Sequence, residues 1–163
     1  MIEMELIGVR VEMRTNQPIV LLRETVDGGR ILPIFIGGAE ATAISLALEG
    51  VQPPRPMTHD LFVDVIESVG GGVERVLVTE LRDKTFYAEL EIRTESGVKT
   101  VSARPSDSIA LAVRTGAAIF ATEEVLTEAA YVDDPDSDDG EQEEVVEQFR
   151  AFLDDINPED FGS

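Results

Sequence analysis

The same order of short segments occurs twice in this chain, and this repeat constrains the fold more than any other feature. In each copy, three segments with the alternating apolar pattern of β-strands precede a helix rich in alanine and leucine. The predicted strands are 5–12, 19–22, 30–36, 73–81, 85–93 and 98–103, and the predicted helices are 39–49 and 105–114. Tight turns between the strands favour antiparallel pairing. We therefore predict an α+β fold in which helices cover a mixed or antiparallel sheet.

A shift of 65 residues superposes Ile44 on Ile109, together with the apolar residues that follow each of them. An internal duplication of the three-strand-plus-helix unit explains this match. Chance similarity between two alanine-rich helices explains it as well, so the sequence leaves both open.

Two helices carry expectations about burial. Helix 39–49 is apolar on almost all sides, which predicts that it is buried. A further helix begins with Thr58 as its N-cap. Apolar residues at helical spacing predict that this helix turns one face to the core. These residues are Leu61, Phe62, Val65, Ile66 and Val69. A short strand at 119–121 and a short helix from Glu123 complete the predicted domain.

The chain divides into a domain and an acidic tail. We assign residues 1–132 to one α+β domain and residues 133–142, rich in Asp, Ser, Pro and Gly, to a flexible linker. Residues 143–163 are predicted to contain an acidic amphipathic helix that docks on the domain or on a protein partner. Its apolar face would comprise Val145, Val146, Phe149, Phe152, Leu153 and Ile156.

Composition excludes several classes of protein. The chain has no cysteine, which rules out disulfides and thiolate metal sites. No signal sequence or membrane span is recognisable, so we expect a soluble, cytoplasmic protein without membrane contact. The net charge is −20, of which −12 lies in the thirteen acids and one arginine of residues 133–163. Tight, sequence-independent binding to nucleic acid needs clustered Lys and Arg, and the sequence has no such cluster.

Polar residues at three junctions between elements are the candidates for chemistry, because sites are usually built at such positions. They are Glu40, Arg55, His59, Asp60, Arg104, Ser106 and Asp107. His59 is the only histidine and could act as a general base. Most of these residues also have a structural explanation, since carboxylates and serines cap helix N-termini. Phe86 and Tyr87 lie on opposite sides of a strand, where one could pack in the core and the other stack on a base.

Several motifs in order resemble the bifunctional nuclease domain family over about residues 1–130. They are Leu32–Ala41, Ala47–Gly50, Pro54–Leu61, Thr85–Ala88 and Ala103–Ala112. The acidic tail resembles the C-terminal extensions of some actinobacterial members. Lys84 departs from the Gly or Asn expected in the turn before Thr85, which leaves the turn type open.

The resemblance implies a nuclease that hydrolyses phosphodiester bonds of RNA and DNA, with nucleic acid as a transient substrate. Under this hypothesis, His59, Asp60, Arg104 and Asp107 are catalytic, and Arg55 and Ser106 bind the substrate. Glu40, Asp60 and Asp107 would hold a divalent metal, Mg²⁺ or Mn²⁺. The alternative is a non-catalytic interaction or regulatory module, favoured by the acidic charge and by the capping explanations.

Three further expectations follow from the sequence. Glu40, His59, Asp60, Arg104 and Asp107 should lie around one cleft if they serve one function. Apolar surface beyond the needs of one small core predicts a homo-oligomer. The charge of the tail predicts that it competes with nucleic acid for the domain, although the same charge could serve only solubility.

Overall fold

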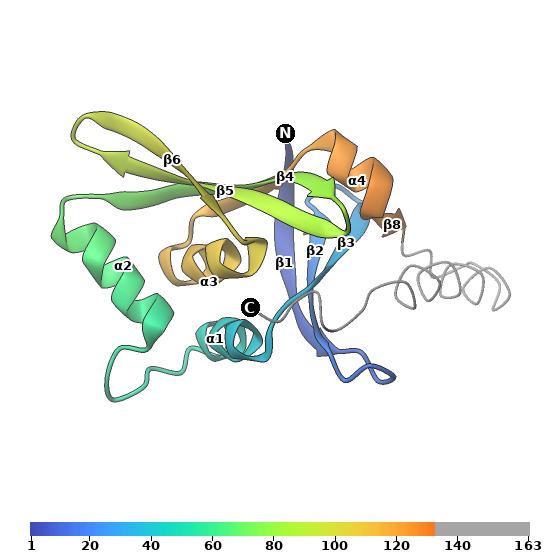
Figure 1. The fold of residues 1–163 in the computed structure, drawn as a ribbon, viewed down its shortest axis with the longest axis horizontal. Coiled ribbons are helices and arrows are strands. Elements are labelled where there is room, and N and C mark those ends of the chain that lie inside the picture. Colours follow the sequence, from blue (N-terminus) through green and yellow to red (C-terminus); the bar gives the residue numbers. More distant parts are fainter. Residues whose placement is uncertain (133–163) are drawn as a thin grey trace, which may run out of the picture.

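The fold is α+β, as the sequence predicts, and residues 1–132 form an eight-stranded mixed sheet with four helices (Figure 1). The last, two-residue strand is not among the predicted ones. The structure is a computed structural model, and it describes residues 1–132. The tail segments 133–142 and 143–163, with their predicted linker and amphipathic helix, lie outside the described residues. The strands are β1 (Ile2–Val11), β2 (Pro18–Glu24), β3 (Arg30–Phe35), β4 (Gly72–Arg82), β5 (Thr85–Thr94), β6 (Gly97–Ala103), β7 (Ala118–Ala121) and β8 (Tyr131–Val132). The helices are α1 (Gly38–Leu48), α2 (Thr58–Ser68), α3 (Pro105–Thr115) and α4 (Glu123–Ala129).

The two predicted three-strand-plus-helix units lie side by side in the sheet, whose strand order is β6-β5-β4-β7-β1-β2-β3-β8. One unit consists of β1, β2 and β3 followed by α1. The other consists of β4, β5 and β6 followed by α3. Strand β7 joins the two units, and its parallel pairing with β4 makes the sheet mixed. Ile44 and Ile109, which the repeat superposes, are both fully buried.

Side chains from the sheet and all four helices form the main core. Alternation along β2 and β3 sends Val20, Leu22 and Leu32 into it, because successive strand residues point to opposite faces. The residues between them, Ile19, Leu21 and Ile31, form a second, smaller cluster on the other face. No helix of the described residues contributes a side chain to that second cluster.

Two expectations about helices are wrong. In α2 only Ile66 of the predicted stripe is buried, whereas Leu61, Phe62, Val65 and Val69 are at least half exposed. Helix α1 is buried only through Ala41, Ala43 and Ile44. Both helices lie at the rim of the fold rather than between layers, so one side of each remains open (Figure 1). The N-cap of α2 is Met57 rather than Thr58, because Thr58 already has helical geometry.

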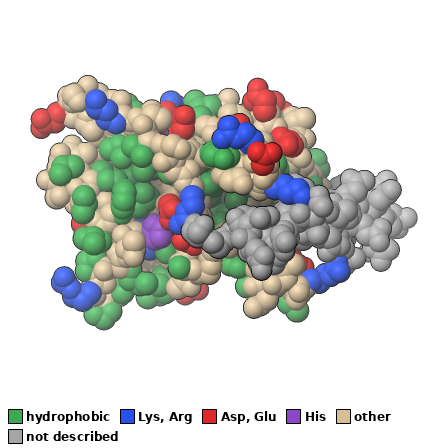
Figure 2. All heavy atoms as spheres, viewed as in Figure 1, with side chains coloured by type: hydrophobic (Ala, Val, Ile, Leu, Met, Phe, Trp, Pro, Cys, Tyr) green, Lys and Arg blue, Asp and Glu red, His purple; other side chains and the backbone are tan. Residues whose placement is uncertain are grey.

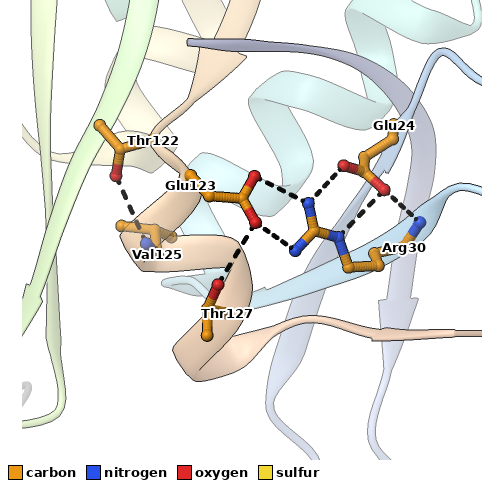
Figure 3. Close-up of polar contacts among 6 residues, drawn as sticks. All are labelled: Glu24, Arg30, Thr122, Glu123, Val125 and Thr127. Atoms are coloured by element: carbon orange, nitrogen blue, oxygen red, sulfur yellow. Dashed lines mark hydrogen bonds and ion pairs between the residues drawn. The ribbon is translucent and has the colours of Figure 1, made fainter.

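An arginine bridge fastens α4 to the sheet (Figure 3). Arg30 at the start of β3 binds the nearly buried Glu24 at 2.7 Å and Glu123 of α4 at 2.9 Å. The hydrogen bonds from Arg30 hold the pKa of Glu24 below its ordinary value, although burial acts in the opposite direction. Thr122 caps α4 by accepting a hydrogen bond from the backbone N–H of Val125. This end of the molecule therefore has a structural role.

The turn between β4 and β5 has a conformation that its sequence does not favour. Arg82 pairs with Thr85, and the two residues between them have positive φ, 49° at Asp83 and 62° at Lys84. Such a two-residue turn normally has Asn or Asp followed by Gly. Lys84 thus occupies a position where glycine would be less strained. No helix among residues 1–132 is long and apolar enough to cross a membrane.

Candidate active site

Helices α1, α2 and α3 begin close together, and each has a carboxylate at its third position. These carboxylates are Glu40, Asp60 and Asp107. A negative charge in the first turn is favourable because the N-terminal N–H groups carry partial positive charge. Helix α3 packs against both α1 and α2. The three first turns therefore bring acidic side chains together. Arg104, the N-cap of α3, and His59, in the first turn of α2, lie next to them.

Four of the predicted residues form one continuous polar network. His59 Nε2 lies 2.9 Å from Oδ1 of Asp107. Arg104 donates from Nε to Oδ2 of Asp107 at 2.8 Å, and from a terminal nitrogen to Oε1 of Glu40 at 2.7 Å. Four of the five residues expected to converge are thus joined by direct contacts, which run from α1 to α2 through Arg104 and Asp107. Figure 2 shows the histidine beside acidic and basic side chains, with hydrophobic side chains around them.

Exposure differs along this network. The side chains of Glu40 and His59 are 15% and 14% exposed, whereas that of Arg104 is 64% exposed. Arg104 can therefore meet an incoming anion while its partner Glu40 stays largely covered and Asp107 is about one third exposed. Because a guanidinium has five N–H donors, it can contact a further oxygen without losing both existing partners.

The network keeps its carboxylate ionised. Burial opposes the ionisation of Asp107, but hydrogen bonds from Arg104 and His59 outweigh it and hold the pKa of Asp107 below its ordinary value. Asp107 first, and then Glu40, raise the pKa of Arg104 through their hydrogen bonds. Asp107 is therefore a permanent acceptor for the histidine near neutral pH.

Asp60 belongs to a neighbouring structural junction. Its Oδ2 accepts a hydrogen bond from the backbone N–H of Met57 at 3.0 Å, which supports the capping explanation. Its Oδ1 lies 2.7 Å from Nε of Arg114, whose side chain is 11% exposed. Arg114 also donates to the backbone carbonyls of Ala43 and Ala110. Arg114 thereby joins all three helices, and it lowers the pKa of Asp60, assisted by the Met57 N–H.

The remaining two predicted residues make no side-chain hydrogen bond or ion pair with this network within residues 1–132. Ser106 is 6% exposed and lines a cavity next to Arg104. Arg55 lies in the exposed loop before α2 and has no ion pair within residues 1–132. The structure therefore places Ser106, but not Arg55, beside the charged cluster.

The carboxylates predicted to bind metal are all engaged by arginine. Glu40 and Asp107 share Arg104, and Asp60 binds Arg114. Within the described part of the chain, no group of three His, Asp or Glu side chains is arranged to hold a metal ion. Carboxylate oxygens suit Mg²⁺ and Mn²⁺ chemically, but this arrangement directs them at guanidinium groups.

Two features of the site were not apparent from the sequence. Arg114 is one basic residue in the last turn of a helix, and no spacing rule connects it to Asp60, which lies 54 positions away. The cavity beside Arg104 has a volume of about 320 Å³ and is lined by segments from β2, β3, β5 and α3. It forms only when these segments come together. In the sequence, the only indication of this cavity was the unusual residue Lys84 at the turn before Thr85.

Comparison with known proteins decides the family. The family model of the bifunctional nuclease domain matches residues 20–134. The chain belongs to the bifunctional nuclease domain family. An uncharacterized protein of Mycobacterium tuberculosis is 46% identical over 164 residues, which is 98% of this chain and 97% of that protein.

Plant members of the family are more distant and longer. Bifunctional nuclease 2 of Arabidopsis thaliana is 33% identical over 103 residues, covering 61% of this chain and 31% of the plant protein. Bifunctional nuclease 1 of rice (Oryza sativa subsp. indica) is 28% identical over 87 residues, covering 52% of this chain and 26% of its own length. The matched region is thus about a third or less of these plant proteins.

Proposed function

We propose that this protein hydrolyses phosphodiester bonds of RNA and DNA at the His59–Asp107–Arg104–Glu40 network. The observation that carries the proposal is the hydrogen bond between Asp107 and His59 beside an exposed arginine. The family and the names of its plant members support a nuclease. A histidine oriented by a carboxylate and placed next to an anion-binding group is an arrangement suited to acyl or phosphoryl transfer chemistry.

Each residue has a distinct role in this proposal. In the tautomer with the proton on Nε2, His59 donates a hydrogen bond to Asp107, and the lone pair on Nδ1 removes a proton from water. The water oxygen forms a bond to phosphorus, and the bond from phosphorus to the leaving sugar oxygen breaks. The proton taken by His59 passes to that oxygen, so the products are a phosphomonoester and an alcohol. Arg104 donates hydrogen bonds to the phosphate oxygens as negative charge develops on them.

Glu40 positions Arg104 rather than touching the substrate. Its carboxylate binds one side of the guanidinium while Asp107 binds another, so the group is held between two helices. Such fixation reduces the reorganisation needed when a phosphate arrives. Asp60 holds the start of α2, and with it His59, through Met57 and Arg114.

A divalent metal remains part of the proposal as an accessory. Mg²⁺ or Mn²⁺ would polarise the phosphate and would draw on Glu40, Asp60 and Asp107. Because arginine engages all three carboxylates, we derive no step through the ion. Hydrolysis measured in EDTA and after addition of Mg²⁺ or Mn²⁺ tests this part. We expect the ion to raise the rate, and equal rates would remove the metal from the scheme.

The catalytic proposal is tested by fluorescent single-stranded DNA and RNA cleavage with matched variants. We expect His59→Gln and Asp107→Asn each to lower kcat by about a hundredfold or more, as loss of general base catalysis does. Asp64→Asn, on the exposed side of α2, is the control that removes a carboxylate without touching the network. Activity unchanged in His59→Gln would show that the cleavage does not depend on this site.

A non-catalytic interaction module is the second candidate function. The exposed apolar residues of α2 favour it, since large apolar side chains gathered on a surface are typical of protein contacts. If purified protein leaves both DNA and RNA intact in all metal conditions, while the variants fold normally, this second function replaces the first.

A further inference from the structure

The cavity beside Arg104 has the chemistry of a site for one nucleotide. We propose that it binds a single nucleotide unit of a single-stranded nucleic acid, with the phosphate at the helix N-termini and the base against the phenylalanine rings. The inference rests on the proposed function for its biological meaning, although the binding itself can be tested without hydrolysis.

The charge of the cavity differs from that of the protein. Among residues 1–132, its lining contains Lys84 and Arg104 but no Asp or Glu, in a chain whose net charge is −20. Because Arg104 also binds Glu40 and Asp107, these basic groups select for an anion through direct hydrogen bonds rather than through long-range attraction. The substrate would therefore gain its electrostatic affinity at this place.

Backbone and hydroxyl groups add a phosphate-binding arrangement. Gly37 and Gly38 begin α1, and Pro105 and Ser106 begin α3, so two helix N-termini border the cavity. Helix N-termini bind phosphate through free N–H groups and the helix dipole. Ser106 is more than nine-tenths buried and lines the cavity, and its hydroxyl makes no side-chain hydrogen bond within residues 1–132. A buried hydroxyl at a cavity wall that has no protein partner indicates that its hydrogen bond is made to a ligand or to water.

The remaining wall suits a base. Phe35 and Phe86 line it together with Pro18, Ile34 and Ile36. Aromatic and apolar side chains stack on bases without sequence preference, because every base has a π-face. A volume of about 320 Å³ lies at the lower end of small-molecule sites, roughly 300–1,000 Å³. This space accommodates one unstacked nucleotide but not a duplex.

The strained turn supports this assignment. Lys84 has a φ of 62°, where glycine would be less costly, and this conformation places the residue at the cavity. Strained backbone is retained where the side chain serves a function. Replacement by glycine should therefore leave the turn intact and remove the Lys84 side chain with its charge.

The test measures binding of adenosine monophosphate (AMP), inorganic phosphate and adenosine to the full chain by calorimetry in EDTA. We expect AMP to bind more tightly than either fragment. Lys84→Gln and Lys84→Gly should weaken AMP and phosphate by about tenfold or more, as loss of a charged hydrogen bond does. Lys84→Gly should unfold at a temperature no lower than wild type, which separates lost binding from lost folding. Lys99→Gln, on exposed β6, is the control and should bind as wild type.

The aromatic wall has its own matched pair. Phe86→Leu should weaken AMP but leave phosphate unchanged, whereas Tyr87→Leu on the same strand should affect neither. Single-stranded oligonucleotide should displace AMP, and blunt duplex should not. Equal effects of Lys84→Gln and Lys99→Gln, or AMP binding no tighter than phosphate and adenosine, would overturn the proposal. Binding of a peptide of residues 143–163 that depends on Lys84, without any binding of AMP, would overturn it in favour of an acidic peptide.

The outcome is distinguishable from that of the catalytic proposal. Protein that binds AMP but cleaves no oligonucleotide refutes hydrolysis and leaves the cavity assignment standing. Protein that cleaves oligonucleotides but fails to bind AMP refutes the cavity assignment alone.

Discussion

At the residue scale, the acidic residues at the helix starts divide into two kinds. Glu40 and Asp107 share one exposed arginine, which an anion can approach. Asp60 instead faces Arg114, whose side chain is largely buried between helices. The same position in the first turn thus belongs to the candidate site in one case and to a structural anchor in the other. The difference lies in which arginine the tertiary structure brings to the carboxylate.

Asp60 is predicted to make stability depend on pH in the acid range. Arg114 and the Met57 N–H hold its pKa below the ordinary value of 3.8, so the unfolded chain binds this proton more readily than the folded one. The stabilisation is therefore present above pH 3.8 and is lost as the pH falls through the lower folded pKa. We expect Asp60→Asn to cost about 1–3 kcal/mol near neutral pH, because Arg114 loses its partner.

Urea unfolding at several pH values checks this prediction. The difference between wild type and Asp60→Asn should shrink below pH 3.8. Asp64→Asn is the control, and its difference from wild type should stay small at every pH. A constant difference for Asp60→Asn down to strongly acid pH would contradict the role of the ion pair.

At the element scale, α2 is the helix whose environment departs most from its sequence pattern. Its apolar residues have the spacing of a core-facing stripe, but only Ile66 is buried. The helix packs on α3 and β4. Periodicity identifies an apolar face, but it does not say what covers that face.

A pair of substitutions separates the two kinds of α2 residue. Ile66→Ala should destabilise the domain by about 2–5 kcal/mol, because it removes buried methyl groups and leaves a cavity. Val65→Ala, one position earlier and 52% exposed, should change stability by about 0.5 kcal/mol or less. Chemical denaturation of dilute protein measures both. Equal losses would show that the exposed face is covered in solution.

At the scale of the whole molecule, two surfaces are open for association. Strand β6 pairs only with β5 among the described strands, so its outer edge is free, and its Val98 and Val101 are about half exposed. The exposed residues of α2 add further apolar surface. Free edges and apolar patches are normally covered or charged in monomeric proteins. These features support the homo-oligomer predicted from the sequence, which stays a prediction.

Light scattering with two matched variants tests the oligomer. We expect wild type to have a multiple of the monomer mass and Phe62→Glu to reduce it. Val26→Glu is the control, because Val26 is at least as exposed as Phe62 but lies in the hairpin after β2, and the strand order separates that hairpin from β6. A monomeric mass for wild type at micromolar concentrations would refute association.

The tail prediction also belongs to the whole molecule. Strand β8 delivers the chain beside β3, where Ile19, Leu21 and Ile31 form the cluster to which no described helix contributes. We expect the apolar residues of 143–156 to dock there and the acidic residues to hinder nucleic acid. Truncation after Val132 should expose the cluster to a hydrophobic dye and strengthen nucleic-acid binding at low salt.

A second variant separates these two effects. Phe149→Ala with Phe152→Ala in the full chain should increase dye binding while retaining the charge of the tail. If truncation leaves nucleic-acid binding unchanged at low salt, competition by the tail is wrong. If the double variant binds no more dye than wild type, docking through these residues is wrong.

The sequence by itself determined the elements, the family and the residues of the charged cluster. Alternation along the strands, the order of strands and helices, and the first-turn positions of Glu40 and Asp107 are local properties, so they are readable without tertiary structure. The tertiary structure decided which partner each charge meets and which apolar face is covered. The bond from Arg114 to Asp60, the exposure of α2 and the cavity between Lys84, Phe86 and Ser106 depend on distant segments meeting. Hydrophobic burial is not directional, so a periodic pattern specifies a surface but not the neighbour that removes it from water.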